Sequence, residues 1–320
     1  MARSKQRSEP AVFIVNPQAG GGKSERQLKE LLAEIQAIYG NAKIVFTERK
    51  LHATEIAREA VKAGAELIVA VGGDGTISEV AAGSFDEKGK AIKPVKQAPA
   101  LGILPAGSGS DYAKTLGIPR ASAIALQILQ TKNTKTVDAG LVEFVGLNGQ
   151  KTKRIFINIA DVGIGGEVVD ILERQGKRLG AFLSYQLATL RGLIGYKNKN
   201  LEITIDKKQK FDGTYNGIII AIGKYFGSGM KIAPNAEPDD GYFDVVMLGD
   251  MGKMEMVAKM QKVRNGSHIF EKKVTVHRAK QISIRADARA LLDCDGEMPG
   301  ECPAEFSILP GALKVVVPPT

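Results

Sequence analysis

In the first 140 residues, short apolar runs alternate with segments whose apolar residues recur at helical spacing, and this alternation restricts the fold more than any other feature. Each run is long enough for a buried strand, and each segment after it is long enough for an amphipathic helix. Strands that alternate with helices pair in parallel beneath those helices. The sequence therefore predicts a Rossmann-like α/β lobe, with strands at 11–16, 42–47, 66–71 and 100–105 and helices at 24–39, 54–64, 76–83, 110–117 and 121–129.

After about Thr136 the pattern changes to runs of strand-forming residues, several of which alternate between apolar and polar positions. This pattern predicts a mainly antiparallel β-sandwich. We therefore expect an α/β domain at residues 1–140 and a β-sandwich domain at 141–320, with a last strand that can return to the first lobe. The expected strands lie at 154–160, 201–205, 215–223, 243–248, 274–278, 281–286 and 313–317, with helical interruptions at about 166–196 and 251–265.

The formal net charge of +9 favours a polyanionic partner, namely nucleic acid, anionic phospholipid or nucleotide phosphate. The sequence has neither zinc-finger spacing nor an aromatic-glycine RNA-binding segment, so we expect no nucleic acid partner. Its apolar runs fall well short of the roughly 20 residues of a membrane-spanning helix. The first ten residues lack the apolar part of a secretory signal, and two cysteines form no disulfide framework, so we expect a cytoplasmic protein.

The stretch VAVGGDGTISEV, residues 69–80, places glycines and Asp74 between an expected strand and an expected helix. Such a turn lies at the carboxyl edge of a parallel sheet, where α/β folds bind ligands. Glycines let the backbone approach a phosphate closely, and amides at a helix start favour negative charge. A carboxylate would repel phosphate directly, so Asp74 is expected to act through a hydroxyl, a water or a metal ion. The alternative is a strained turn that Asp74 caps.

Two other phosphate motifs fail on counting. A P-loop ending at Lys23 would need a glycine where Pro17 stands, and two GxGxxG candidates have Tyr112 and Val168 at their third glycine. Residues 101–119 repeat the order of strand, glycine turn and helix, so the two turns can enclose one nucleotide. The polar side chains of this second turn are Ser108, Ser110 and Asp111.

Five blocks, in the order NPQAGGG, GGDGTISEV, LGILPAGSGSDYAKTLGIP, APNAEPDDGYFDVVML and DCDGE, resemble the bacterial soluble diacylglycerol kinase and lipid kinase family. The resemblance covers nearly the whole chain from Asn16 onward. GGDGT alone is shared with NAD kinases and is related to the phosphofructokinase superfamily, whereas the five blocks together are highly specific.

The resemblance implies a nucleotide-binding α/β lobe, a β-sandwich lobe and transfer of the γ-phosphate of ATP to a lipid hydroxyl, with ATP and Mg²⁺ as cofactors. Relatives usually read GTGND where this chain has GSGSD at 107–111, so Ser110 replaces an asparagine and removes a carboxamide. By resemblance, the ATP site is formed by Asn16, Thr47, Gly72, Gly73, Asp74, Gly75, Thr76, Glu79 and Ser108.

Phosphoryl transfer also needs a carboxylate that accepts the proton of the lipid hydroxyl. Asp295 and Glu297 are two residues apart, so a locally extended backbone would direct both to one side, where like-charge repulsion raises the pKa of one. By resemblance to the family's DGE motif, Glu297 is the general base and Asp295 supports it. A solvated acidic hairpin tip is the alternative.

Two magnesium sites are implied by the resemblance. Asp138 matches an aspartate that in relatives joins Asp74 and Asp111 around the catalytic magnesium through water. The acid-rich block at 233–246 matches a loop that holds a structural magnesium, and an ordinary acidic turn is the alternative. Its expected ligands are the Asp240 carboxylate and main-chain oxygens of Glu237 and Tyr242.

Segment 177–200 has apolar residues flanked by basic ones, which suggests reversible attachment to anionic lipid at the inner face of the membrane. A helix that simply covers a sheet is the alternative. We also expect a homodimer, because members of the family often pair. The leading hypothesis is an ATP-dependent lipid kinase that phosphorylates diacylglycerol or a similar lipid. The rivals are an NAD kinase-like enzyme, and a non-catalytic nucleotide- or lipid-binding regulator.

Overall fold

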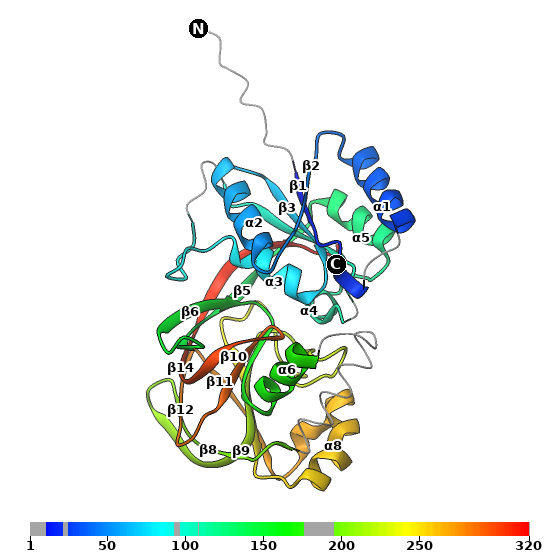
Figure 1. The fold of residues 1–320 in the computed structure, drawn as a ribbon. Coiled ribbons are helices and arrows are strands. Elements are labelled where there is room, and N and C mark those ends of the chain that lie inside the picture. Colours follow the sequence, from blue (N-terminus) through cyan, green and yellow to red (C-terminus); the bar gives the residue numbers. More distant parts are fainter. Residues whose placement is uncertain (1–10, 22–24, 93–96, 108, 176–194, 320) are drawn as a thin grey trace.

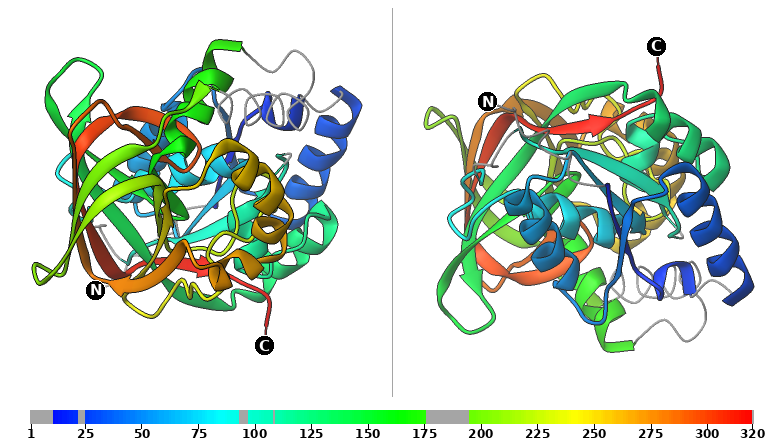
Figure 2. Two further views of the ribbon diagram at one scale, coloured as in Figure 1. Left: turned by 90° about the horizontal axis from the view of Figure 1, so that it is seen from below. Right: turned by 90° about the horizontal axis from the view of Figure 1, so that it is seen from above.

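The computed structural model describes residues 11–21, 25–92, 97–107, 109–175 and 195–319, arranged as two lobes (Figure 1). Figure 2 looks along the long axis from each end and shows the two lobes lying over one another. Within the described residues, no helix is long and apolar enough to span a bilayer.

The first lobe is built on a parallel sheet in the order β2-β1-β3-β4. Strands β1, β3 and β4 are apolar on both faces because helices cover both sides, with α2 and α3 on one side and α1 and α5 on the other (Figure 1). The strands are β1 (Val12–Val15), β2 (Lys43–Phe46), β3 (Leu67–Gly72) and β4 (Ala100–Pro105). The helices are η1 (Ala19–Gly21), α1 (Glu25–Ile38), α2 (His52–Ala63), α3 (Asp74–Ala82), α4 (Asp111–Thr115) and α5 (Ser122–Thr131).

The second lobe is an antiparallel sandwich around the rings of Phe156, Phe243 and Phe306. Helix α6 (Ile164–Gln175), helix α8 (Lys253–Asn265) and η2 (Ser267–Phe270) lie outside the strands. The strands are β5 (Thr134–Gly146), β6 (Lys151–Phe156), β7 (Ile159–Gly163), β8 (Lys199–Ile205), β9 (Gln209–Ala221), β10 (Phe243–Gly249), β11 (Val274–Ala279), β12 (Gln281–Ala286), β13 (Leu291–Cys294) and β14 (Glu297–Val316).

Strand β14 connects the two lobes. It pairs antiparallel with β13, β12 and β5 in the second lobe, and its end pairs in parallel with β4 through Lys314 and Ala100. The described strands therefore form one continuous hydrogen-bonded network. Strand β5 accompanies β14 and runs through residue 140, where the domain boundary is expected from the sequence.

The carboxyl ends of the parallel strands all meet at the edge of the first lobe that faces the second lobe. Asn16 follows β1, Thr47 follows β2, Gly73 follows β3 and Ala106 follows β4. Parallel strands end on the same side of the sheet, so polar groups that follow each strand are collected there. This edge and the start of β14 form the walls of the site described next.

Candidate active site at the lobe junction

The two glycine-rich turns of the first lobe pack directly against each other. A Cβ atom at Gly107 would lie 2.4 Å from the Gly73 Cα, so the backbone admits no side chain there. Gly73 itself is extended, with φ −90° and ψ −175°, and it precedes the first residue of α3. The close approach brings the ends of β3 and β4 together beside the start of α3, an arrangement suited to a phosphate group.

Asn16 ties the end of β1 to this turn. Its backbone N–H donates to the carbonyl of Val71 at 3.0 Å, and its side-chain Nδ2 donates to the Thr76 hydroxyl at 3.0 Å. Its Oδ1 accepts a hydrogen bond from the Gln18 N–H at 2.9 Å. Because both the NH₂ group and the oxygen of its side-chain amide form hydrogen bonds, Asn16 holds the hydroxyl of Thr76 at a fixed place near the glycines.

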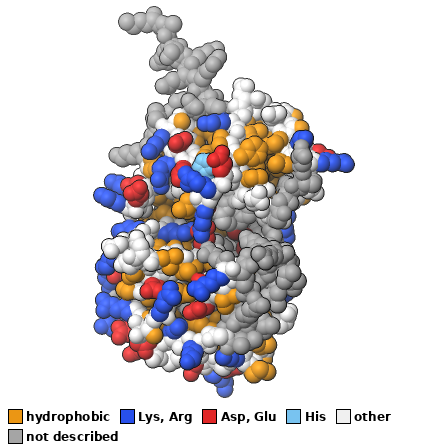
Figure 3. Space-filling model, in the orientation of Figure 1, with side chains coloured by type: hydrophobic (Ala, Val, Ile, Leu, Met, Phe, Trp, Pro, Cys, Tyr) orange, Lys and Arg blue, Asp and Glu red, His pale blue; other side chains and the backbone are white. Residues whose placement is uncertain are grey.

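A cavity of about 340 Å³ opens beside these residues and includes a residue of the second lobe. Its volume lies within the range of small-molecule sites. Figure 3 shows basic and acidic side chains gathered at the level where the lobes meet. The wall includes Asn16, Thr47, Lys50, Gly75, Thr76 and Glu79 from the first lobe and Glu297 from the second.

The carboxylates of Asp74 and Asp111 converge on Gly109. An ideal Cβ at Gly109 would lie 3.0 Å from one Asp74 oxygen and 3.3 Å from one Asp111 oxygen. Asp74 accepts a hydrogen bond from the Tyr112 N–H at 3.1 Å, and Asp111 accepts one from the Ser228 N–H at 2.9 Å. Burial, together with the charge of Asp74, raises the pKa of Asp111 to about 6.

This acid pair fits a divalent cation. The second oxygen of Asp111, Oδ1, is buried and has no hydrogen-bond partner among the described residues. Two convergent carboxylate oxygens are the ligands that Mg²⁺ prefers, and a cation would relieve the repulsion between them. Asp74 and Asp111 are therefore suited to hold magnesium.

Asp138 lies on β5, and its carboxylate contacts the acid-rich block and β14. Its two carboxylate oxygens accept hydrogen bonds from the N–H groups of Gly241 at 2.7 Å and Gly311 at 2.8 Å. Its own N–H donates to the Pro238 carbonyl at 2.7 Å. These contacts assign Asp138 to joining β5, the 238–241 turn and β14.

Glu79 lies on the cavity wall and caps a helix. Its carboxylate oxygens accept hydrogen bonds from the N–H groups of Leu51 at 3.0 Å and Ala53 at 3.2 Å, at the start of α2. Burial raises the pKa of Glu79, and the two amides oppose the rise. A carboxylate held in this way orients α2 and borders the cavity.

The backbone at Asp295 is not extended, so the expectation that Asp295 and Glu297 point to one side is wrong. Asp295 and Gly296 have φ values of 52° and 85° and form the turn between β13 and β14. The turn sends the two carboxylates in different directions. Burial, rather than the charge of Glu297, raises the pKa of Asp295.

The Asp295 carboxylate anchors this turn to both lobes. It accepts hydrogen bonds from the Ser78 hydroxyl of α3 at 2.6 Å and from the N–H groups of Ile157, Asn158 and Ile159 at 2.9, 3.0 and 3.1 Å. Because α3 also carries Gly75 and Thr76, the anchor fixes the position of the glycine turn relative to β14. Asp295 is thus a positioning residue.

Of Asp295 and Glu297, it is Glu297 that reaches the cavity. Its Oε2 lies 2.6 Å from Nη2 of Arg154 and 3.6 Å from Nζ of Lys50. The Glu297 and Arg154 side chains are 15% and 20% exposed, so this pair is partly shielded from water. Sequence reasoning did not identify Arg154, Lys50 or Ser78, because lysine, arginine and serine at these places match no motif.

Three carboxylates of the acid-rich block, Glu237, Asp239 and Asp240, are paired with cations. Asp240 forms an ion pair with Arg278, and Glu237 lies 2.9 Å from Lys224. Asp240 also accepts the Tyr242 N–H at 3.0 Å. Among the described residues, no three acidic, histidine or cysteine side chains gather around one point. A magnesium ion at Asp240 would compete with Arg278 for the carboxylate, and the set of Asp240 with main-chain oxygens of Glu237 and Tyr242 stays a prediction.

Ser110 starts α4 in the left-handed conformation, with φ 56° and ψ 40°, which asparagine and glycine adopt more readily than serine. Its buried hydroxyl has no hydrogen-bond partner among the described residues. Ser108 lies outside the described residues, as does segment 177–200 up to residue 194.

Two family models match the chain. The model for the diacylglycerol kinase catalytic domain matches residues 10–142, and the model for the YegS C-terminal NAD kinase beta sandwich-like domain matches residues 159–317. The first range holds both glycine turns, and the second holds Asp295 and Glu297.

Curated relatives and solved structures agree with these models. The chain is 29% identical to a diacylglycerol kinase of Bacillus subtilis (strain 168), over 96% of each chain. It is 28% identical to a diacylglycerol kinase of Staphylococcus haemolyticus (strain JCSC1435), over 96% of this chain and 88% of the relative.

A crystal structure of a diacylglycerol kinase from Bacillus anthracis str. Sterne has a TM-score of 0.70 at 23% identity and covers 98% of this chain and 99% of its own. Another crystal structure from the same strain has a TM-score of 0.77 at 25% identity and covers 100% and 99%. Yeast NADH kinase complexed with NADH shares the fold, with a TM-score of 0.54 at 11% identity over 98% and 85%.

Proposed function

The chain belongs to the bacterial diacylglycerol kinase family and is a kinase of the phosphotransferase class; on that premise we propose that it transfers the γ-phosphate of ATP to a hydroxyl of diacylglycerol or a related lipid, with Glu297 as general base. One observation carries the proposal. Glu297 lines the same cavity as Thr47, which follows β2, and Gly75 and Thr76, at the start of α3. A proton acceptor and a phosphate-binding turn therefore face one space, as transfer to a hydroxyl requires.

The first lobe binds and orients the nucleotide in this proposal. Amides of the glycine turn, with Asn16 and Thr76 beside them, face the phosphates. Asp74 and Asp111 would hold Mg²⁺, which neutralises phosphate charge when bound. Lys50, on the same wall, adds a positive charge close to Glu297. NAD kinases share the fold and the GGDGT motif with this chain, whereas the curated relatives that match over nearly its whole length are diacylglycerol kinases.

Glu297 accepts the proton of the lipid hydroxyl, and Arg154 holds its carboxylate in place. The ion pair at 2.6 Å restricts the rotamers of Glu297 before the lipid arrives. The anchor formed by Asp295 and Ser78 fixes the turn from which Glu297 projects. The general base is therefore held by side chains of α3 and β6.

The test is transfer of labelled phosphate from ATP to a panel of lipids that includes diacylglycerol, phosphatidylglycerol, ceramide and a sphingoid base. Glu297→Gln should reduce transfer by about 10²–10⁴-fold, the usual contribution of a general base. Glu301→Gln is the matched control, since Glu301 lies on the same strand but pairs with Arg289 at the surface. Full activity in Glu297→Gln would remove it as the base, and a panel with no labelled lipid would contradict lipid transfer.

For the membrane, we propose a face formed by α8 and η2; the expectation for segment 177–200 falls mostly outside the described residues and stays a prediction. Met254, Val257 and Phe270 are large apolar residues with exposures of 81%, 46% and 84%. Arg264 and Lys272 are exposed nearby in the chain, and Figure 3 shows hydrophobic and basic side chains side by side at this end of the second lobe. We propose that this face attaches the enzyme reversibly to anionic lipid, with about 1 kcal/mol per well-placed cation.

Co-sedimentation with vesicles of phosphatidylglycerol and phosphatidylcholine tests this attachment. Binding should fall as salt rises and as the anionic lipid is diluted, and Phe270→Asp should weaken it. The control is Leu147→Asp, because Leu147 is 66% exposed but belongs to the turn between β5 and β6. Equal loss in both variants would refute the assignment of this face. The expected homodimer remains a proposal, which light scattering in solution can check.

A further inference from the structure

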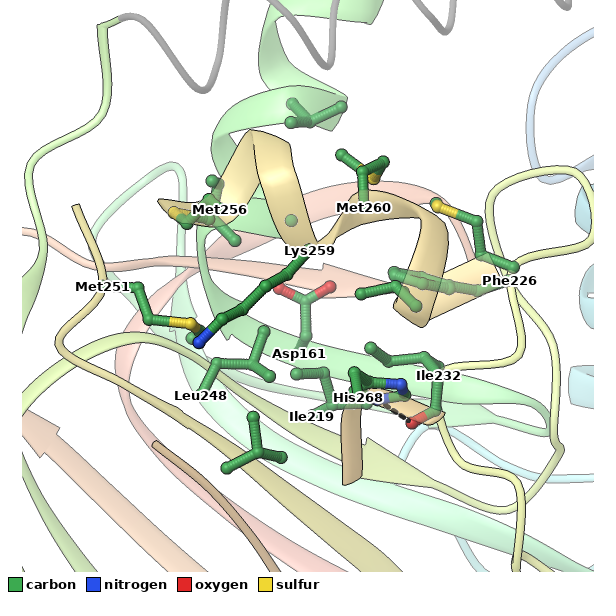
Figure 4. Close-up of a pocket in the computed structure, with 17 residues that line it drawn as sticks. Asp161, Ile219, Phe226, Ile232, Leu248, Met251, Met256, Lys259, Met260 and His268 are labelled. Carbon is green, nitrogen blue, oxygen red and sulfur yellow. Dashed lines mark hydrogen bonds between the residues drawn. The ribbon is translucent and has the colours of Figure 1, made fainter. Parts of the chain in front are cut away.

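Two buried acids face each other across neighbouring strands of the second lobe. Asp161 on β7 and Asp293 on β13 are cross-strand partners, and they are 2% and 6% exposed. Figure 4 shows the carboxylate of Asp161 directed from β7 toward α8, between apolar side chains. A buried carboxylate is costly unless hydrogen bonds compensate for the lost water, so the hydrogen-bond partners of the two acids decide what the pair does.

The start of α6 lies directly on the Asp161 carboxylate, and two glycines make this contact possible. A Cβ atom at Gly165 would lie 2.0 Å from an Asp161 oxygen, and one at Gly166 would lie 2.8 Å from the carbonyl oxygen of Leu291 on β13. The amides of Gly165 and Gly166 donate hydrogen bonds to Asp161. They belong to the first turn of α6, where N–H groups lack helical partners and favour negative charge. The stretch GIGGEV, which fails as a dinucleotide motif, therefore holds Asp161 at the start of the helix.

Asp293 connects this helix start to the turn between β13 and β14. Its Oδ1 accepts the N–H of Gly296 at 2.9 Å, and Gly296 stands between Asp295 and Glu297. The Asp293 carboxyl is also hydrogen-bonded to that of Asp161, which requires a proton on one of the two. Burial, the charge of Asp161 and the hydrogen bond to it raise the pKa of Asp293. Asp293 is therefore the donor, and Asp161, which already accepts two helix amides, is the acceptor.

The charged and titratable side chains around the pair leave this proton between the two acids. Those on β13, the 295–296 turn, α6, α8 and η2, and before β8, include Cys294, Asp295, Glu167, Lys259, His268 and Tyr196. The Lys259 ammonium lies 2.7 Å from Glu255 and 3.1 Å from Glu271, so its charge is already paired. Burial raises the pKa of Cys294 and of Tyr196 and lowers that of His268. At neutral pH these three groups keep their neutral forms.

We propose that Asp161 and Asp293 are a positioning pair for phosphate transfer, in which one shared proton ties the start of α6 to the turn that presents Glu297. The inference rests on the proposed role of Glu297 as general base. Neither acid lines the cavity of Glu297, so the pair acts through the backbone of Gly296. Arg154 holds the carboxylate of the base, and the pair holds the chain from which that carboxylate projects. A small misplacement of a reacting group lowers the rate strongly, which is why such a link matters.

Amide hydrogen exchange, followed by NMR without ATP or lipid, tests the link independently of kinase activity. In Asp161→Ala the amide of Gly296 should exchange about tenfold faster, although its own hydrogen bond is to Asp293. Asp293→Asn should keep Gly296 protected, because its oxygen accepts the Gly296 N–H and its NH₂ group donates to Asp161. The control is Asp170→Ala, since Asp170 lies on α6 but pairs with Arg174. Unchanged exchange of Gly296 in Asp161→Ala, or equal acceleration in the control, would overturn the proposal.

Infrared spectroscopy tests the shared proton and needs no alanine variant, so it remains decisive if Asp161→Ala fails to fold. A protonated carboxyl has a carbonyl stretch that a carboxylate lacks. At about pH 8 the wild type should show such a band, and Asp293→Asn should lose it. Burial raises the pKa of Asp111 and of Asp244 only to about 6, so both are ionised under these conditions. Identical carboxyl bands in the wild type and Asp293→Asn would overturn the shared proton.

Kinetics test the role in transfer. Asp161→Ala and Asp293→Ala should each lower kcat by about 10–100-fold with little change in the KM for ATP, and Asp293→Asn should recover most of the loss. The double alanine variant should be no slower than either single variant, because the two acids act as one unit. Multiplied losses in the double variant, or wild-type kcat in both single variants, would overturn the positioning role. A panel without labelled lipid would remove the role in transfer, whereas the exchange of Gly296 would still decide the link between α6 and the turn.

Discussion

Asp295→Asn should destabilise the protein even though it only replaces one carboxylate oxygen with an NH₂ group. The Asp295 carboxylate receives four hydrogen bonds, two at each oxygen, from Ser78 and from three consecutive backbone amides. An asparagine has one accepting oxygen, so its NH₂ group would face two donors and those two bonds would be lost. A hydrogen bond to a charged group contributes about 1.5–3 kcal/mol.

The loss is partly offset. Burial raises the pKa of Asp295, so the charged form is held at a cost that the neutral amide avoids. The gross loss of about 3–6 kcal/mol should therefore leave a net destabilisation of about 2–4 kcal/mol. Ser78→Ala removes one of the four bonds and should cost about 1.5–2 kcal/mol.

Urea unfolding followed by circular dichroism measures these differences. The matched control is Asp206→Asn, because Asp206 also accepts two backbone amides, from Lys280 and Gln281, but at an exposed turn. It should cost less than about 1 kcal/mol. A free energy of unfolding for Asp295→Asn within about 0.5 kcal/mol of the wild type would refute the role of Asp295 as an anchor. So would a control variant that loses as much.

Gly107→Ala should abolish ATP binding, measured by calorimetry, because its methyl would overlap the backbone of the facing turn, whereas Gly252→Ala, with no atom near the new methyl, should bind ATP normally. Ser110→Gly should raise the free energy of unfolding by about 1 kcal/mol by relieving a left-handed serine, and a lower melting temperature would contradict this. The pKa of Asp161, about 7, lies above that of an unfolded aspartate, so the folded state binds an extra proton between about pH 4 and 7 and stability falls as pH rises through this window. Asp161→Asn should flatten that slope in urea titrations, and an unchanged slope would show that other groups cause it. Arg154→Met should lower kcat with little change in the ATP affinity, and Arg154→Lys should recover part of the loss; equal kcat in all three proteins would exclude a positioning role.

The local sequence pattern was enough to predict much of the fold and part of the candidate site. The alternation of runs and helical segments identified the parallel strands, since the periodicity of each element is set by its own residues. The glycine turn at 72–75 was recognisable because only glycine permits such close backbone contact. Glu297 was separated from ordinary acidic residues by family resemblance, whereas the bare residues left a solvated hairpin tip open.

Sequence reasoning failed where it could not identify which residues contact each other. The expectation that the carboxylates of Asp295 and Glu297 point to one side assumed an extended strand, whereas the chain forms a left-handed turn there. The role of Asp138 at a magnesium ion stays a prediction, but its hydrogen bonds with the amides of Gly241 and Gly311 could not be predicted from the sequence. A single aspartate in a strand gave no indication that Asp161 would face Asp293.

By itself, the sequence determined which segments become strands, helices and glycine turns, because periodicity and backbone freedom act over a few neighbouring residues. Only the tertiary structure decided which acids work together. Ser78 and Asp295 are 217 positions apart and Arg154 and Glu297 are 143 apart, and β14 alone brings them to the parallel sheet by pairing with β4 at its far end. Residues so far apart in the sequence come into contact only when the two cores have packed. The position of Glu297 in the cavity is therefore a property of the folded chain.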